Sequence, residues 1–157
     1  MKAIIPVAGR GTRLRPHTHT MPKALLHVAG KTIIEHILDE IIPLNPEEVV
    51  FIVGHLGDKI QACIEENVDV PARFVRQEKA EGIAHAVYQT KEYIEGYDKP
   101  VLIVLGDTIF KSDLVAVANR GGSSLGVRAV DDPSRFGVVV LDGGKISRMV
   151  EKPDEPI

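Results

Sequence analysis

A glycine-rich loop, Gly9-Arg-Gly-Thr-Arg-Leu14, directly follows the first apolar run of the sequence. Glycines allow the backbone to approach a ligand closely, and successive N–H groups can bind an anion. The loop does not match the dinucleotide fingerprint G-x-G-x-x-G, because Leu14 replaces the third glycine, and it lacks the G-K-S/T of a Walker P-loop. On spacing alone, a phosphate site and a structural turn are equally open, and a nicotinamide-dependent oxidoreductase is disfavoured.

The residues that follow the loop extend this pattern. The segment GRGTRLRPHTHTMPKALLHVAGKTII resembles the signature of the sugar nucleotidyltransferases, G-x-G-T-R-L-x-P-x-T-x-x-x-P-K-x-L-x-x-V-x-x-K-P. One departure is Thr32, which stands where the family usually has proline. The identical positions are Gly9, Gly11, Thr12, Arg13, Leu14, Pro16, Thr18, Pro22, Lys23, Leu25, Val28 and Lys31.

Later segments resemble further motifs of this family, in the family's order. VLIVLGD resembles the strand that delivers a metal-binding aspartate, here Asp107. QEKAEGIAHAV resembles the base-recognition stretch Q-x-x-x-x-G-x-A-x-A. DDPSRFGVVVLD resembles D-P-x-x-F/Y-G-V-V, and Glu151-Lys152-Pro153 matches E-K-P. The resemblance therefore extends from Met1 to Pro153.

The resemblance implies a nucleotidyl transfer. The phosphate of a sugar 1-phosphate attacks the α-phosphorus of a nucleoside triphosphate, and pyrophosphate leaves. Because the attack brings two anions together, the site must neutralise charge and hold the groups in line. In the family, the loop residues Gly9, Gly11 and Thr12 wrap the triphosphate. Arg13 contacts the leaving pyrophosphate, and Lys23 neutralises charge beside the reacting phosphates.

Asp107 is the metal ligand that the resemblance implies, with Mg²⁺ as the cofactor. A hard cation suits a carboxylate combined with phosphate oxygens. Asp107 also comes after a predicted strand, at the edge where open α/β sheets bind ligands. The alternative for Asp107 is an N-cap of the following helix, since aspartate is a preferred capping residue.

Base and sugar recognition fall on the remaining motif residues. For Gln77 and Gly82, the alternative to base reading is a polar strand end and a helix start. For Glu151 and Lys152, the alternative to a sugar site is an exposed ion pair before a proline. We interpret His85, within GIAHA, as a packing residue. The resemblance assigns base reading to Gln77 and Gly82, sugar hydroxyls to Gly137 and Glu151, and the sugar phosphate to Lys152.

Within the family, GIAHA and THTMPKAL look most like the branch that acts on glucose 1-phosphate with dTTP or UTP. A mannose-1-phosphate guanylyltransferase is the alternative inside the class, because those enzymes share the first motif. A module that binds nucleotide or sugar phosphate without turnover is the alternative outside it.

These residues need a scaffold that brings strand ends together. Apolar runs predict strands over 3–8, 49–53, 73–76 and 101–105, alternating with helices after the first three, one of them over 82–94. We expect a Rossmann-like α/β/α fold in three layers with a mostly parallel sheet. Strand-like segments at 125–130, 136–141 and 145–151, with a turn at Gly143-Gly144, predict antiparallel pairing added to that sheet in the last third.

Composition narrows the function classes. Nineteen Lys and Arg against twenty-two Asp and Glu give a net charge of −3, which argues against nucleic acid as a partner. No apolar run approaches the roughly 18 residues of a membrane span. The start MKAIIPVAG does not resemble a signal peptide, and a single cysteine, Cys63, cannot form an internal disulfide. We therefore expect a cytoplasmic protein.

The length of 157 residues suits a single nucleotidyltransferase domain over residues 1–157. Relatives continue well past the E-K-P segment, so we expect this domain to be truncated on its C-terminal side. A truncated domain should expose a sheet edge and apolar surface, which favours homo-oligomers.

Overall fold

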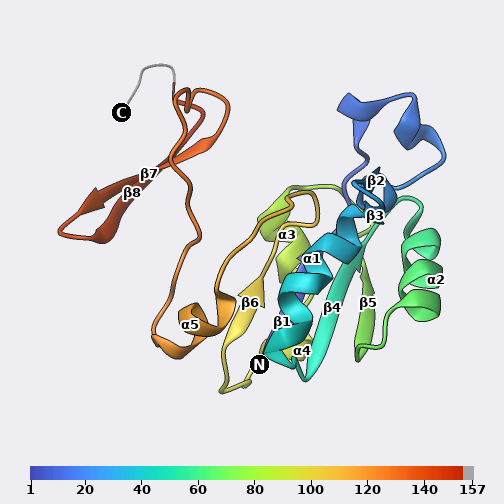
Figure 1. Cartoon of the computed structure of the whole chain (residues 1–157), viewed down its shortest axis with the longest axis horizontal. Helices are drawn as coiled ribbons and strands as arrows, with labels where there is room; N and C mark the ends of the chain where they lie inside the picture. The colour runs from blue at the N-terminus through green and yellow to red at the C-terminus, as the bar shows by residue number, and fades with distance from the viewer. Residues whose placement is uncertain (154–157) are drawn as a thin grey trace. The chain divides into compact units, whose positions relative to one another are not determined.

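A four-stranded parallel sheet forms the core of residues 1–120 in the computed structural model, which describes residues 1–153 (Figure 1). In spatial order the strands are β5 (Ala72–Arg76), β4 (Glu48–Val53), β1 (Lys2–Pro6) and β6 (Val101–Ile103). Ile4 in β1 lies opposite Val50 of β4 and Ile103 of β6, which defines the register of these three strands.

Helices cover both faces of this sheet. Because side chains alternate along a strand, Ile5 packs on one face and Ile4 on the other. The first face contacts α1 (Ile33–Ile41) and α2 (Gly57–Asn67), and the second contacts α3 (Ile83–Tyr88) and α4 (Lys91–Ile94). The predicted α/β/α fold in three layers is confirmed.

Thr32, the departure from the family signature, begins α1. Its side-chain oxygen accepts a hydrogen bond from the backbone N–H of Glu35, and the Glu35 carboxylate accepts from the backbone N–H of Thr32 at 2.7 Å. This reciprocal capping box satisfies two N–H groups that a helix start leaves free. The hydrogen bonds from Thr32 also lower the pKa of Glu35. Threonine therefore has a local role at this position that proline could not fill.

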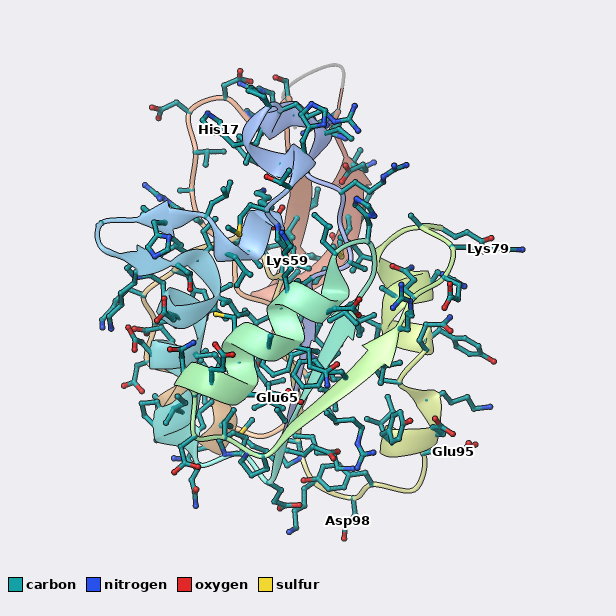
Figure 2. All side chains as sticks on the ribbon, turned by 90° about the vertical axis from the view of Figure 1, so that its right-hand side faces the viewer. His17, Lys59, Glu65, Lys79, Glu95 and Asp98 are labelled. Atoms are coloured by element: carbon teal, nitrogen blue, oxygen red, sulfur yellow. The ribbon has the colours of Figure 1, made fainter. Side chains whose placement is uncertain are left out.

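A long connection between β1 and α1 carries the predicted phosphate loop. It consists of three short 3₁₀ turns, η1 (Thr12–Leu14), η2 (His17–His19) and η3 (Lys23–Leu25), followed by the small hairpin of β2 (His27–Val28) and β3 (Lys31–Thr32). From α2, Lys59 Nζ donates a hydrogen bond to the Thr20 carbonyl oxygen at 2.7 Å, which ties the connection to the helix layer (Figure 2).

A second compact unit begins at Gly121, where β7 (Gly137–Asp142) and β8 (Lys145–Glu151) pair as an antiparallel hairpin. Gly143 and Gly144 at its turn both have positive φ, so the predicted hairpin is confirmed. The predicted strand over 125–130 is wrong, because no segment of residues 1–153 pairs with it. Within this unit, β7 and β8 bond to each other, and the addition of this hairpin to the main sheet stays a prediction. The single domain over 1–157 stays a prediction.

Three predicted boundaries are corrected. The helix over 82–94 is two helices, because Thr90 is buried in a turn where its Oγ1 donates to the Val87 carbonyl oxygen at 2.7 Å. The strand over 3–8 ends at Pro6, although the Val7 N–H still donates to the Ile52 carbonyl oxygen of β4 at 2.8 Å. The strand over 101–105 ends at Ile103, next to the point where Pro6 has no N–H to donate. A helix that the sequence did not predict, α5 (Leu114–Asn119), begins at Asp113, whose carboxylate accepts from the Ala116 N–H.

Strand β6 is one edge of the four-stranded sheet and carries exposed apolar side chains. Val101 and Ile103 in β6 and Leu105 just after it are exposed, and they alternate along the chain. An edge strand with apolar side chains favours pairing of its free side with another chain. Self-association remains a prediction, which light scattering of the purified chain tests.

At the amino ends of the strands, one carboxylate joins three chain segments. Glu47 accepts hydrogen bonds from Lys99 Nζ at 2.7 Å, from the Tyr97 hydroxyl at 3.0 Å and from the Met1 amino group at 3.2 Å. These donors lower the pKa of Glu47 from 4.5 to about 2, with Lys99 contributing most. The ionised carboxylate therefore connects the strand ends of β1, β4 and β6.

We expect this lowered pKa to make folding stability depend on acid. The contribution of Glu47 is complete above its unfolded pKa of 4.5 and is lost as pH falls towards about 2. Thermal unfolding of wild type and Glu47→Gln should therefore differ at about pH 6 and converge near pH 2. Glu66→Gln, on the exposed side of α2, is the control and should follow wild type at every pH. A constant difference between wild type and Glu47→Gln over this range would contradict the assignment.

Candidate active-site cleft

The carboxyl ends of β1, β5 and β6 open onto a cleft of about 490 Å³ within residues 1–120. Its wall is formed by the loop after β1, the loop after β5 and the turn after β6. This is the edge at which open α/β sheets bind ligands. The structure brings together all the site residues predicted in this part of the chain: Gly9, Gly11, Thr12, Arg13, Lys23, Gln77, Gly82 and Asp107.

The two glycines of the loop differ in their surroundings. Gly11 has a φ of 60°, and its carbonyl oxygen accepts from Thr18 Oγ1 at 2.7 Å. A Cβ at Gly11 would lie 2.9 Å from Thr18 Cγ2 and 3.3 Å from Lys23 Cβ. A Cβ at Gly9 would meet no atom within 4 Å. Gly11 is therefore required by the loop itself, whereas the space above Gly9 is open to the cleft.

Opposite charges meet across this cleft. Lys23 Nζ lies 2.9 Å from Asp107 Oδ2, and the two side chains are 30% and 54% exposed. Arg13 is exposed on η1 and makes no hydrogen bond or ion pair with its side chain among the described residues. An exposed ion pair contributes little to stability. The arrangement leaves two cations and one carboxylate available to a ligand.

Asp107 is positioned by the residue before it. A Cβ at Gly106 would clash with Val7 and lie 2.7 Å from the Pro6 carbonyl oxygen, so the chain passes directly against the end of β1. This close approach places the Asp107 carboxylate beside the loop that follows β1. The alternative in which Asp107 caps the next helix is wrong, because Asp113 caps α5.

Gln77 and Gly82 form the opposite wall. Gln77 is 8% exposed, and its backbone N–H donates to the Val53 carbonyl oxygen at 2.8 Å, at the end of β4. Its amide nitrogen lies 3.4 Å from the Gly82 carbonyl oxygen and 3.0 Å from His85 Nδ1. Gly82, with a φ of 99°, begins α3. His85, interpreted from sequence as a packing residue, therefore contacts a cleft side chain directly.

The predicted sugar-site residues form a group of their own in the second unit. Gly137 lies opposite Glu151 in the hairpin, and a Cβ there would come within 3.1 Å of Glu151 Oε2. Lys152 Nζ lies 3.2 Å from Glu151 Oε1, and the Lys152 N–H donates to the Phe136 carbonyl oxygen at 2.9 Å. The hairpin end thus holds one ammonium and one carboxylate side by side.

No group of three or more His, Cys, Asp and Glu side chains within residues 1–153 is arranged to hold a metal ion. None of the helices in the same range has the length and apolar character needed to cross a membrane.

Comparison with known proteins gives consistent matches along the chain. A family model described as nucleotidyl transferase matches residues 2–157. The chain is 36% identical over 165 residues to the UTP–glucose-1-phosphate uridylyltransferase AglF of Haloferax volcanii, covering 99% of the chain and 67% of that protein. It is 38% identical over 156 residues to the bifunctional protein GlmU of Methanococcus vannielii, covering 99% of the chain and 36% of that protein.

Among solved structures, the chain matches a crystal structure described as a glucose-1-phosphate thymidylyltransferase from Bacillus anthracis in complex with a sucrose. The TM-score is 0.85 at 32% sequence identity, over 99% of the chain and 66% of that structure. Across these proteins the chain spans between 36% and 67% of their lengths.

Proposed function

Because this chain belongs to the family of nucleotidyl transferases, we propose that it joins a sugar 1-phosphate to a nucleoside triphosphate and releases pyrophosphate. The favoured substrates are glucose 1-phosphate with UTP or dTTP, the branch to which the similar proteins AglF and the Bacillus anthracis enzyme belong by description. The observation that carries the proposal is the meeting of the glycine loop, Arg13, Lys23 and Asp107 in one cleft.

The residues of the cleft suit the charge changes of this reaction. An oxygen of the sugar phosphate forms a bond to the α-phosphorus, and the bond from that phosphorus to the oxygen bridging to the β-phosphate breaks. The electron pair leaves with pyrophosphate, so negative charge grows on the leaving group. Arg13 and Lys23 would neutralise that charge, and the N–H groups from Gly9 to Thr12 would bind phosphate oxygens. A phosphate dianion is already a nucleophile, so the protein needs no general base.

The chemistry of Asp107 fits a magnesium ion. Its carboxylate is 54% exposed towards the cleft, and Mg²⁺ is commonly held by one or two carboxylates together with substrate phosphates. When bound, the ion would neutralise charge on phosphate oxygens. Lys23 orients the carboxylate through its 2.9 Å contact.

In the second unit, we assign the sugar phosphate to Lys152 and sugar hydroxyls to Glu151 and the Gly137 backbone. The pairing of Lys152 with Glu151 keeps a donor and an acceptor next to each other at the hairpin end. A sugar phosphate offers both an anion and hydroxyl donors, which matches that pair.

A binding module without turnover is the second candidate. The chain spans 36% to 67% of the proteins it matches, so turnover by this chain is itself part of the proposal. A panel of UTP, dTTP, CTP and GTP, each with glucose 1-phosphate or mannose 1-phosphate and Mg²⁺, separates the candidates by pyrophosphate release. Release with UTP or dTTP and glucose 1-phosphate supports the proposal. Release only with GTP and mannose 1-phosphate would support a guanylyltransferase, and a thermal shift by UTP without release would support the binding module.

The two loop glycines give a matched pair of variants. Gly11→Ala should lower the free energy of unfolding by about 1–2 kcal/mol, because alanine is strained at positive φ. Gly9→Ala should leave the thermal unfolding temperature unchanged, yet weaken UTP binding by roughly tenfold to a hundredfold, because its methyl group would displace the phosphate from the backbone. Calorimetry measures both quantities. Unchanged UTP affinity in Gly9→Ala would contradict the placement of the phosphates.

A further inference from the structure

Thr18 packs against the glycine loop from outside the described wall of the cleft. Its side chain is 5% exposed, and its Oγ1 donates to the Gly11 carbonyl oxygen at 2.7 Å. Its methyl carbon, Cγ2, occupies the space that a side chain at Gly11 would need. Because a β-branched side chain has few χ1 rotamers, the methyl contact also fixes the direction of the hydroxyl. Thr18 therefore restrains the Gly11 carbonyl from the buried side of the loop.

The direction of the Gly11 carbonyl determines the direction of the next N–H group. The Gly11 carbonyl oxygen also accepts from the Leu14 N–H at 2.9 Å, so two donors hold it in place. The peptide bond from Gly11 to Thr12 is trans, and in a trans peptide the N–H is opposite to the C=O. The Thr12 N–H therefore points away from Thr18.

The Thr12 N–H is available to a ligand. Thr12 lines the cleft, and its N–H donates to no acceptor among residues 1–153. A backbone N–H that leaves water requires a hydrogen-bond acceptor. The phosphate oxygens of a nucleoside triphosphate are acceptors of the kind that backbone N–H groups of glycine loops bind.

We propose that Thr18 is a positioning residue that directs the Thr12 N–H towards the phosphates of the nucleoside triphosphate. Its hydroxyl acts through the Gly11 peptide group and does not touch the ligand. Without that hydroxyl, the Leu14 N–H is the one remaining restraint of the described chain on a carbonyl that belongs to a freely rotating glycine. This inference rests on the proposed function and adds a residue outside the cleft wall to its phosphate site.

Calorimetric titration with UTP and Mg²⁺ tests the proposal in three variants. Thr18→Val keeps the methyl contact and the size of the side chain but lacks the hydroxyl, so it should bind UTP about tenfold more weakly. Thr18→Ser retains the hydroxyl and should restore most of the affinity. Thr90→Val is the matched control, because Thr90 is also buried and its Oγ1 donates to the Val87 carbonyl oxygen at 2.7 Å, away from the cleft wall. It should bind UTP like wild type.

A second readout separates positioning from a merely structural role. The solvent-exchange rate of the Thr12 amide proton, measured by NMR, should fall about tenfold in wild type and in Thr18→Ser when UTP and Mg²⁺ are saturating. In Thr18→Val the same addition should leave the rate nearly unchanged. Equal protection of Thr12 in wild type and Thr18→Val would make Thr18 structural only and would overturn the proposal.

The remaining outcomes distinguish Thr18 from the site as a whole. Equal UTP affinity in wild type and Thr18→Val, or an equal loss in Thr18→Val and Thr90→Val, would overturn the role of Thr18 and leave the proposed function standing. Wild type that binds no UTP would overturn both. The wild-type exchange rate needs no variant, so it tests the proposal even if Thr18→Val does not fold. Bound UTP that leaves the Thr12 amide unprotected would overturn the proposal.

Discussion

Replacing Asp107 with asparagine is expected to lower pyrophosphate release from UTP and glucose 1-phosphate about a thousandfold at saturating Mg²⁺. Asparagine keeps the shape of the side chain and still accepts from Lys23, so the loss reports the missing charge. Mg²⁺ requires that negative charge in order to bind beside the phosphates. The increase in UTP affinity caused by Mg²⁺ should disappear in the same variant, which gives a readout independent of turnover.

Asp98→Asn is the matched control for this variant. Asp98 lies at the opposite end of residues 1–120 from the loop that carries His17 (Figure 2). It follows α4 and precedes β6, so it lies at the amino end of β6, whereas the cleft lies at the carboxyl ends of the strands. Asp98→Asn should retain wild-type turnover and Mg²⁺ dependence. If Asp107→Asn behaved like Asp98→Asn, then Asp107 would have no part in Mg²⁺ binding or in turnover.

The second large effect is expected at Lys23. Lys23→Met keeps the aliphatic stem that packs against the loop and removes the ammonium beside the reacting phosphates. Because charge grows there in the transition state, kcat should fall roughly a hundredfold to a thousandfold. The thermal unfolding temperature should change little, since the Lys23–Asp107 pair is partly exposed.

Lys31 provides the control for Lys23. It also pairs with an aspartate, Asp39, at 2.6 Å, and both side chains are about half exposed. Lys31→Met removes the same kind of ion pair without touching the cleft wall. It should leave kcat at the wild-type value. If the two lysine variants lose turnover equally, then a general electrostatic effect, and not a contact with phosphate, accounts for the loss.

Elements defined by local pattern were predictable. The helix of α1 follows from isoleucine spacing and ends near Pro43, and β4 follows from an uninterrupted apolar run. The failure at 125–130 has a physical cause: an alternating pattern permits a strand, but pairing requires a neighbour elsewhere in the chain. Thr90 shows a third case, in which one buried hydroxyl ends a helix whose apolar pattern continues.

The candidate site also contains some residues whose positions were predictable from the sequence and others whose contacts were not. Gly9, Gly11 and Asp107 follow strand ends, so sequence order alone predicts that they meet at one sheet edge. The contact between His85 and Gln77 could not be predicted, because it depends on how the loop from Gln77 to Gly82 folds back onto α3. The spacing of Gln77, His85 and Gln89 offers a weak signal, since the last two lie one helical turn apart.

The central claim is that the cleft after β1, β5 and β6 binds a nucleoside triphosphate. Titration of the nitrogen-15-labelled chain with UTP and Mg²⁺, followed by amide chemical shifts, tests it whether or not the chain turns over. We predict that the largest shifts occur at Gly9, Gly11, Arg13, Gly82 and Asp107. Shifts confined to the amino ends of the strands, around Glu47 and Asp98, or no shifts at millimolar UTP, would contradict the claim.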